Sequence, residues 1–155
     1  MPSAGIGFRE TEMSATPLVF RTTHRVQFSE LDPYNHVGTS TYATYFIDHR
    51  MEGLRDRIGW DLKALGTLPF MTWVRRIEID YVHPVQGDEE ITITSFVRGF
   101  RGPDAFIDCS MTDAAGTVVC KCAMTVAHVD KASRHATDWP PDLIALFFED
   151  GNRAQ

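Results

Sequence analysis

Cysteine is scarce in this sequence, and long hydrophobic runs are absent. The three cysteines, Cys109, Cys120 and Cys122, lack the C-x-x-C spacing of redox sites, and no second Cys or His pair completes a zinc set. We therefore expect buried free thiols, a reducing cytoplasmic location and no bound metal. No stretch approaches the roughly 18 apolar residues of a membrane-spanning helix, and the N-terminus lacks the apolar core of a signal peptide.

Positive charge is also in the minority. The chain has 15 Lys and Arg residues against 21 Asp and Glu residues, which gives a formal net charge of -6. An acidic chain gives no reason to expect binding to nucleic acid or to an anionic membrane. It still permits an anionic ligand, because a few local cations or a helix N-terminus can hold one.

The remaining composition is typical of a globular protein. Hydrophobic residues make up 43% and charged residues 23% of 155 residues, which fits one domain with a sizeable core. Residues 1–17 are rich in Gly, Ser, Thr and Ala and predict a flexible leader. We expect a single domain over residues 18–150.

Hydrophobic spacing predicts a strand followed by one long helix. Residues 20–30 alternate between apolar and polar side chains, as a strand does. After a turn, a helix is expected up to Ile58, capped by Ser40 or Thr39 and stopped by Gly59. Two apolar stripes run along it: Tyr42, Tyr45, Phe46 and His49, and Ile47, Met51, Leu54 and Ile58. Such a helix should be largely wrapped by other structure.

The second half of the chain predicts four more strands and a short helix. The strands are expected at residues 71–83, 90–100, 105–112 and 117–129, and the helix at residues 142–149. One face of the first of these strands should carry Met71, Trp73, Ile77, Ile79 and Tyr81, and one face of the next Ile91, Ile93, Ser95 and Val97. This order predicts an α+β fold in which the sheet curls around the helix. The aromatics Trp73, Phe96 and Phe106 exceed what one helix can cover, so we expect a partner chain.

Two stretches of sequence carry a family resemblance. The sequence RVQFSELDPYNHV at residues 25–37, with the aromatic and charged residues of the helix after it, resembles the opening signature of hot dog-fold acyl-CoA thioesterases. The 4-hydroxybenzoyl-CoA thioesterase branch is the most similar. The later sequence IEIDY at residues 77–81, with Pro84 and Gly87-Asp88, resembles the second-strand pattern of the family. Many members have two asparagines after His-Val and others have Tyr-His, whereas this chain has Gly38 and Thr39.

The resemblance implies a fold, an activity and an assembly. The fold would be a five-stranded antiparallel sheet wrapped around one long central helix. The activity would be hydrolysis of an acyl-CoA or acyl-carrier-protein thioester, with coenzyme A present only as part of the substrate and no other cofactor. The assembly would be a homodimer or a homotetramer.

Asp32 is the leading candidate for catalysis. Its carboxylate could attack the thioester carbonyl to form a mixed anhydride, or deprotonate a water molecule. The spacing alone favours a turn cap beside Pro33, and the resemblance reverses this preference toward catalysis. The amide of Thr39 is expected to bind the oxyanion at the helix start, where Gly38 allows a close approach of substrate.

Other residues have roles that the sequence leaves open. His36 could orient Asp32, polarise the carbonyl or shape the turn, and Asn35 could contact substrate. Tyr42 could line an acyl pocket or belong to the core. Arg98 and Arg101 are candidate ligands of the CoA phosphates, and further candidates are Arg75, Arg76 and Lys131. Glu30 is expected to be a surface charge, and salt bridges to Arg50 or Arg55 are expected for Asp48, His49 and Glu52.

Two other functions remain as alternatives. One is a hot dog hydratase or dehydratase of acyl thioesters, whose Asp and His usually lie on a hydration-specific loop that is not found here. The other is a non-catalytic acyl-thioester-binding protein, which Asp32 and the glycine turn argue against only weakly.

Overall fold

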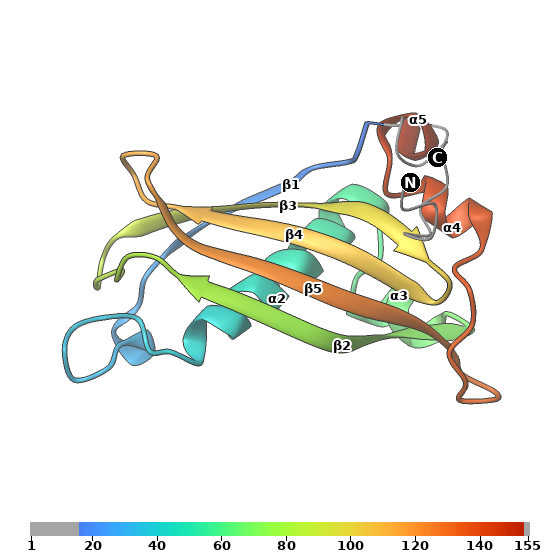
Figure 1. The fold of residues 1–155 in the computed structure, drawn as a ribbon, viewed down its shortest axis with the longest axis horizontal. Coiled ribbons are helices and arrows are strands. Elements are labelled where there is room, and N and C mark those ends of the chain that lie inside the picture. Colours follow the sequence, from blue (N-terminus) through green and yellow to red (C-terminus); the bar gives the residue numbers. More distant parts are fainter. Residues whose placement is uncertain (1–15, 154–155) are drawn as a thin grey trace, which may run out of the picture.

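One five-stranded antiparallel sheet curves around a long helix (Figure 1). The computed structural model describes residues 16–153. The strands are β1 (Phe20–Arg25), β2 (Phe70–Tyr81), β3 (Glu90–Arg101), β4 (Asp104–Thr112) and β5 (Val118–Asp130), in the spatial order β1-β3-β4-β5-β2. The helix α2 (Thr41–Gly53) continues into a π-helical turn, Leu54–Ile58. The predicted α+β architecture is confirmed.

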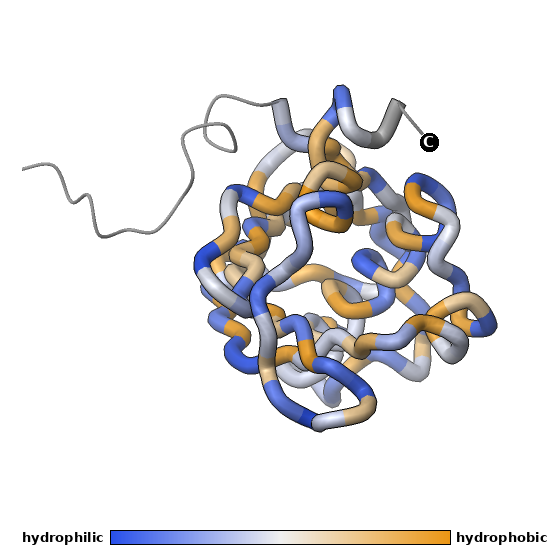
Figure 2. Tube along the Cα trace, turned by 90° about the vertical axis from the view of Figure 1, so that its right-hand side faces the viewer, coloured by the Kyte–Doolittle hydropathy of each residue, from blue (hydrophilic) through white to orange (hydrophobic). Residues whose placement is uncertain are grey.

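The three central strands bury alternate residues against α2. The burial patterns of β3 and β4 alternate from residue to residue, and Figure 2 shows hydrophobic and hydrophilic positions alternating along the chain. The predicted inner face of β3 is confirmed, because these residues are buried: Ile91, Ile93, Ser95 and Val97. Cys109 of β4 lies opposite Cys122 of β5, and all three cysteines are buried free thiols, as predicted.

The single apolar face predicted for β2 is wrong, because a β-bulge interrupts the strand. The pairing with β5 shifts between Val74 and Arg76, so Arg75 is an extra residue in the ladder. Met71 and Trp73 precede the bulge and lie on the outer face of the sheet. The apolar residues after it lie on the helix face: Ile77, Ile79 and Tyr81.

The long helix is covered on one side only. Its first predicted stripe, Tyr42, Tyr45, Phe46 and His49, is buried. Ile47 of the second stripe is 41% exposed and the rest of that stripe is only half-buried, so this chain covers less of the helix than predicted. The sheet ends at its β2 edge and leaves this side of α2 open. On the covered side, a Cβ at Gly53 would overlap the ring of Phe20, which shows how closely α2 packs against β1.

The helix cap differs from the prediction, and its stop does not. Neither Ser40 nor Thr39 makes a side-chain capping bond, and the Thr41 N–H instead donates to the Gly38 carbonyl at 2.9 Å. Gly59 follows the helix with φ 87°, as expected of a glycine stop. A shorter helix, α3 (Leu62–Thr67), then leads to β2.

Both ends of the described chain differ from the predicted elements. The first strand stops at Arg25, and the short 3-10 helix η2 (Phe28–Glu30) follows it. The predicted helix at residues 142–149 is split into α4 (Pro141–Ala145) and α5 (Glu149–Arg153), because Phe147 and Phe148 between them are buried in the core.

The predicted leader falls almost entirely on residues 1–15, which lie outside the described residues. Its last residue, Pro17, pairs with Phe148. No helix in residues 16–153 is long and apolar enough to cross a membrane.

Candidate active site

Asp32 lies in a tight turn between η2 and α2. Its Oδ1 accepts hydrogen bonds from the N–H groups of Tyr34 at 2.8 Å and His36 at 3.1 Å. Its own N–H donates to the His36 carbonyl at 2.7 Å. Within residues 16–153 no hydrogen bond involves Oδ2. One oxygen therefore holds the turn, and the other is left for chemistry.

Backbone contacts fix this turn against the segment that precedes β3. The Val37 N–H donates to the Val85 carbonyl at 2.8 Å, and His36 pairs with Gln86. Asn35 has φ 61°, a left-handed conformation that Asn tolerates better than most residues. A Cβ at Gly87 would lie 3.2 Å from Asn35 Oδ1, so the Asn35 side chain lies toward Gly87.

An open cleft of about 280 Å³ brings four predicted site residues together: Asp32, His36, Thr39 and Tyr42. The C-terminal end of β2 and the residues after it complete the cleft, and they had not been predicted as site residues: Tyr81, Val82, His83 and Pro84. The Tyr81 hydroxyl donates to the Thr39 carbonyl at 2.9 Å, and its ring meets the Tyr42 ring edge-on at 5.2 Å between centroids. The sequence signals at Tyr81 were the strand pattern of residues 71–83 and the family resemblance of residues 77–81, and neither indicated a role in the site.

Helix α2 begins beside this cleft, and Thr39, just before the helix, lines it. The Gly38 N–H donates to the Glu30 carbonyl at 3.0 Å, so that group is already used. No acceptor among the described residues binds the N–H of Thr39 or Ser40. Unpaired N–H groups at a helix start carry the positive end of the helix dipole. The predicted oxyanion site at Thr39 is therefore geometrically available.

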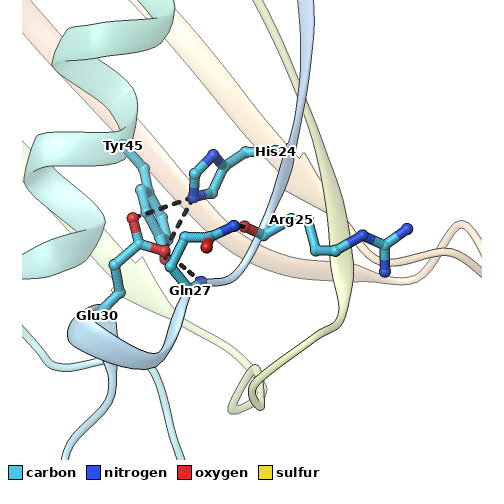
Figure 3. Close-up of polar contacts among 5 residues, drawn as sticks. All are labelled: His24, Arg25, Gln27, Glu30 and Tyr45. Atoms are coloured by element: carbon cyan, nitrogen blue, oxygen red, sulfur yellow. Dashed lines mark hydrogen bonds and ion pairs between the residues drawn. The ribbon is translucent and has the colours of Figure 1, made fainter.

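Glu30 lies behind the turn, in a polar cluster with His24, Gln27 and Tyr45 (Figure 3). Its carboxylate accepts hydrogen bonds from the Gln27 N–H at 2.7 Å and the Tyr45 hydroxyl at 2.8 Å, and contacts His24 Nε2 at 2.9 Å. Burial raises the pKa of the carboxyl group, but these contacts together hold it below its ordinary value. Glu30 is therefore not the free surface charge expected, but a half-buried carboxylate engaged by three neighbours. The cluster joins β1, η2 and α2, and through the Glu30 carbonyl it also holds Gly38.

The polar residues within α2 have different partners from those predicted. Glu52 pairs with Arg55 at 3.8 Å, as expected. His49 instead contacts Thr22 Oγ1 at 2.6 Å and Ser95 Oγ at 2.7 Å. Burial, and then the charge of Arg50, lower the His49 pKa to about 4.

Asp48 lies on the exposed side of α2. It forms no ion pair with any residue from 16 to 153, so the predicted salt bridge is not found. The reason is geometric, because Arg50 points into the core while Asp48 points to solvent.

None of the cations predicted for the CoA phosphates lines the Asp32 cleft. Arg98 pairs with Asp108 at 3.3 Å, and both Arg98 and Arg101 lie over the Phe106 ring. Both lie near the C-terminal end of β3, where Arg101 pairs with Asp104 of β4. A strand of 12 residues such as β3 spans roughly 40 Å. The other candidates are also engaged: Arg75 pairs with Asp104, Arg76 with Glu78, and Lys131 donates to the carbonyls of Leu65 and Gly66.

Comparison with known proteins identifies the family. The sequence pattern of the thioesterase-like superfamily matches residues 26–147. The long-chain acyl-CoA thioesterase FadM of Escherichia coli (strain K12) is 25% identical over 117 residues, which are 75% of this chain and 87% of that protein.

Solved structures share the fold. SAV2348 from Staphylococcus aureus, solved in complex with CoA, superposes with a TM-score of 0.73 at 17% identity, over 81% of this chain and 78% of that one. The DHNA-CoA thioesterase from Staphylococcus aureus superposes with a TM-score of 0.69 at 12% identity, over 77% and 80% of the two chains. The resemblance seen in the sequence is therefore confirmed: the chain is a thioester hydrolase with a hot dog fold, and it belongs to the thioesterase-like superfamily.

Proposed function

We propose that the protein hydrolyses an acyl-CoA thioester in the cleft at the start of α2. The observation that carries this proposal is that Asp32, with one oxygen unpaired by described residues, and Thr39, with an unpaired N–H group, line the same cleft. An acyl-carrier-protein thioester presents the same reacting carbonyl. The similarity to an acyl-CoA thioesterase supports coenzyme A as the carrier.

Asp32 acts on the thioester carbonyl as a nucleophile or as a general base. As a nucleophile, its carboxylate forms a mixed anhydride and expels the thiolate, and water then hydrolyses the anhydride. As a base, it takes a proton from the water that attacks the carbonyl. Both routes release the free acid and the thiol. The N–H of Thr39 stabilises the negative charge that develops on the carbonyl oxygen in either route.

Neighbouring side chains orient these groups. The Tyr81 hydroxyl holds the Thr39 carbonyl, and this peptide unit also carries the Ser40 N–H. Tyr81 therefore fixes the direction of a second oxyanion donor. His36, beside Asp32 in the cleft, is placed to bind the carbonyl or a water molecule, and Tyr42 forms part of the wall.

Substitution of Asp32 tests the proposal. Asp32→Asn keeps an oxygen for the Tyr34 and His36 N–H groups, so the turn should remain while the carboxylate is lost. We expect thiol release from an acyl-CoA panel to fall by about 10²- to 10⁴-fold. Circular dichroism should be unchanged, and Asp48→Asn, on the exposed side of α2, should keep wild-type activity.

Two results would contradict this function. The first is hydrolysis by Asp32→Asn at the wild-type rate. The second is no thiol release with any acyl group. Hydration of an enoyl thioester without thiol release would indicate the hydratase alternative instead.

A further inference from the structure

A second cavity lies between α2 and the sheet, and no residue lines both it and the Asp32 cleft. Its volume is about 100 Å³. Most of its walls are aliphatic or aromatic side chains, among them Leu54, Val74 and Ile107. Val74 and Ile47, at 44% and 41% exposed, lie where the cavity meets solvent. None of its residues has a role in breaking the thioester bond as proposed above.

Arg50 places a positive charge at this apolar cavity. The residue is only 8% exposed, and one of its N–H groups donates to Ser95 Oγ at 2.9 Å. Its guanidinium group lies 4.3 Å from the centre of the Phe20 ring. A guanidinium group has five N–H donors, and no other hydrogen bond or ion pair of Arg50 is formed with residues 16–153.

No carboxylate is present to neutralise this charge. The residues that line the cavity include no Asp or Glu. Burial lowers the pKa of Arg50 to about 10, so the group is still charged at neutral pH. A buried charge without a counter-ion is unfavourable, and an anion that entered the cavity would relieve this cost.

Trp139 adds a second donor without a partner. The residue is 3% exposed and lines the same cavity. Its buried indole N–H finds no acceptor among the described residues. Buried N–H groups are nearly always paired, so two underused donors at one cavity indicate a ligand that brings acceptors.

We propose that this cavity binds a small apolar carboxylate, with the carboxylate on Arg50 and the hydrocarbon part against the aliphatic walls. A cavity of roughly 150 Å³ accommodates benzene, so this one, at about 100 Å³, encloses about four carbons, and a longer chain extends through the opening at Ile47 and Val74. A charge-assisted, bidentate contact is the strongest that a guanidinium group makes with a carboxylate. The carboxylate has two possible sources: a free acid, or the far end of a dicarboxylic acyl thioester. Only the second source rests on the proposed function.

Binding to the full chain tests this site without measuring turnover. Butanoate and hexanoate, each compared with its neutral amide at matched ionic strength, are titrated by calorimetry and thermal shift. We expect the carboxylates to bind at least tenfold more tightly than the amides. Arg50→Met should abolish this preference.

A second variant keeps the proposal testable if Arg50→Met does not fold. Ala105→Leu fills the cavity and leaves Arg50 in place, so it should abolish binding of both acid and amide. Ala123→Leu makes the same change on the other face of the sheet and should bind hexanoate as wild type does. Equal binding of acid and amide by the wild type, or wild-type binding by Ala105→Leu, would overturn the proposal.

Turnover distinguishes the two sources of the carboxylate. If the site reads the end of a dicarboxylic acyl group, Arg50→Met should raise KM at least tenfold for adipyl-CoA and not for hexanoyl-CoA. If it binds a free acid, the two KM values should change together while hexanoate binding is lost. Hexanoate should still bind Asp32→Asn, so failure of the catalytic proposal and failure of this one are separable.

Discussion

At the scale of single residues, His49 is a side chain whose ionisation the fold controls. It lies between Thr22 and Ser95, and Ser95 Oγ also accepts a hydrogen bond from Arg50. The Ser95 hydroxyl proton is therefore free to donate to His49 Nε2. Neutral His49 then carries its proton on Nδ1 and donates it to Thr22.

This arrangement predicts a loss of stability in mild acid. The His49 pKa falls from 6.5 to about 4 on folding, so between these values only the unfolded state takes up a proton. The free energy of unfolding should decrease as the pH falls from about 6.5 to about 4, by on the order of 3 kcal/mol. Urea unfolding at several pH values should show this slope, and His49→Gln should flatten it. A His49 imidazole that titrates near pH 6.5 in the folded protein, as measured by nitrogen NMR, would contradict the prediction.

The residues of the cleft show what the sequence can indicate and what it cannot. Asp32, His36, Thr39 and Tyr42 are close in sequence, so one turn and the start of one helix bring them together. Tyr81 comes from the far end of β2. Its contact with Thr39 depends on how the sheet is placed against α2, which no local pattern encodes.

At the scale of elements, two glycines after the long helix differ in backbone conformation alone. Gly59 has φ 87°, whereas Gly66 lies in helix α3, and a Cβ at either position would meet nothing within 4 Å. We expect Gly59→Ala to lower the free energy of unfolding by about 1 kcal/mol, because Ala is strained at positive φ. Gly66→Ala should raise it by roughly 0.5–1 kcal/mol through helix propensity. Denaturant titration measures both, and changes of the same sign would contradict the argument.

Elements whose buried residues recur at one regular spacing were predictable from the sequence. Elements that a bulge or an early end interrupts were not. Helix α2, strand β4 and most of β3 keep one regular spacing of buried residues, so their sequences indicate their position and burial. The pattern of β3 breaks only near a bulge between Val97 and Gly99. The bulge at Arg75 in β2 depends on pairing with β5. The early end of β1 depends on contacts of Glu30 with His24 and Tyr45, from other elements.

At the scale of the whole molecule, the edge strand β2 is an exposed surface that favours binding to another protein chain. Its hydrogen-bonding groups are paired only on the β5 side. Large apolar side chains along it are exposed, including Trp73 at 61%, Val74 at 44% and Tyr81 at 51%. An exposed apolar edge of this length is prone to association. We therefore propose that a second copy of the chain covers β2, as a homodimer would.

A charge placed on this edge tests the assembly. Ile77 is 36% exposed on β2, and Ile77→Lys should shift the mass measured by light scattering toward the 17.5 kDa of one chain. Val19→Lys, at a residue 42% exposed just before the opposite edge strand β1, should keep the wild-type mass. Because the Asp32 cleft adjoins the end of β2, the Ile77→Lys monomer should also hydrolyse acyl-CoA more slowly. Two results would contradict a β2 interface: a wild-type protein that is monomeric at all concentrations, or a dimer that only Val19→Lys dissociates. A mass four times that of one chain would show that such dimers pair into the predicted tetramer.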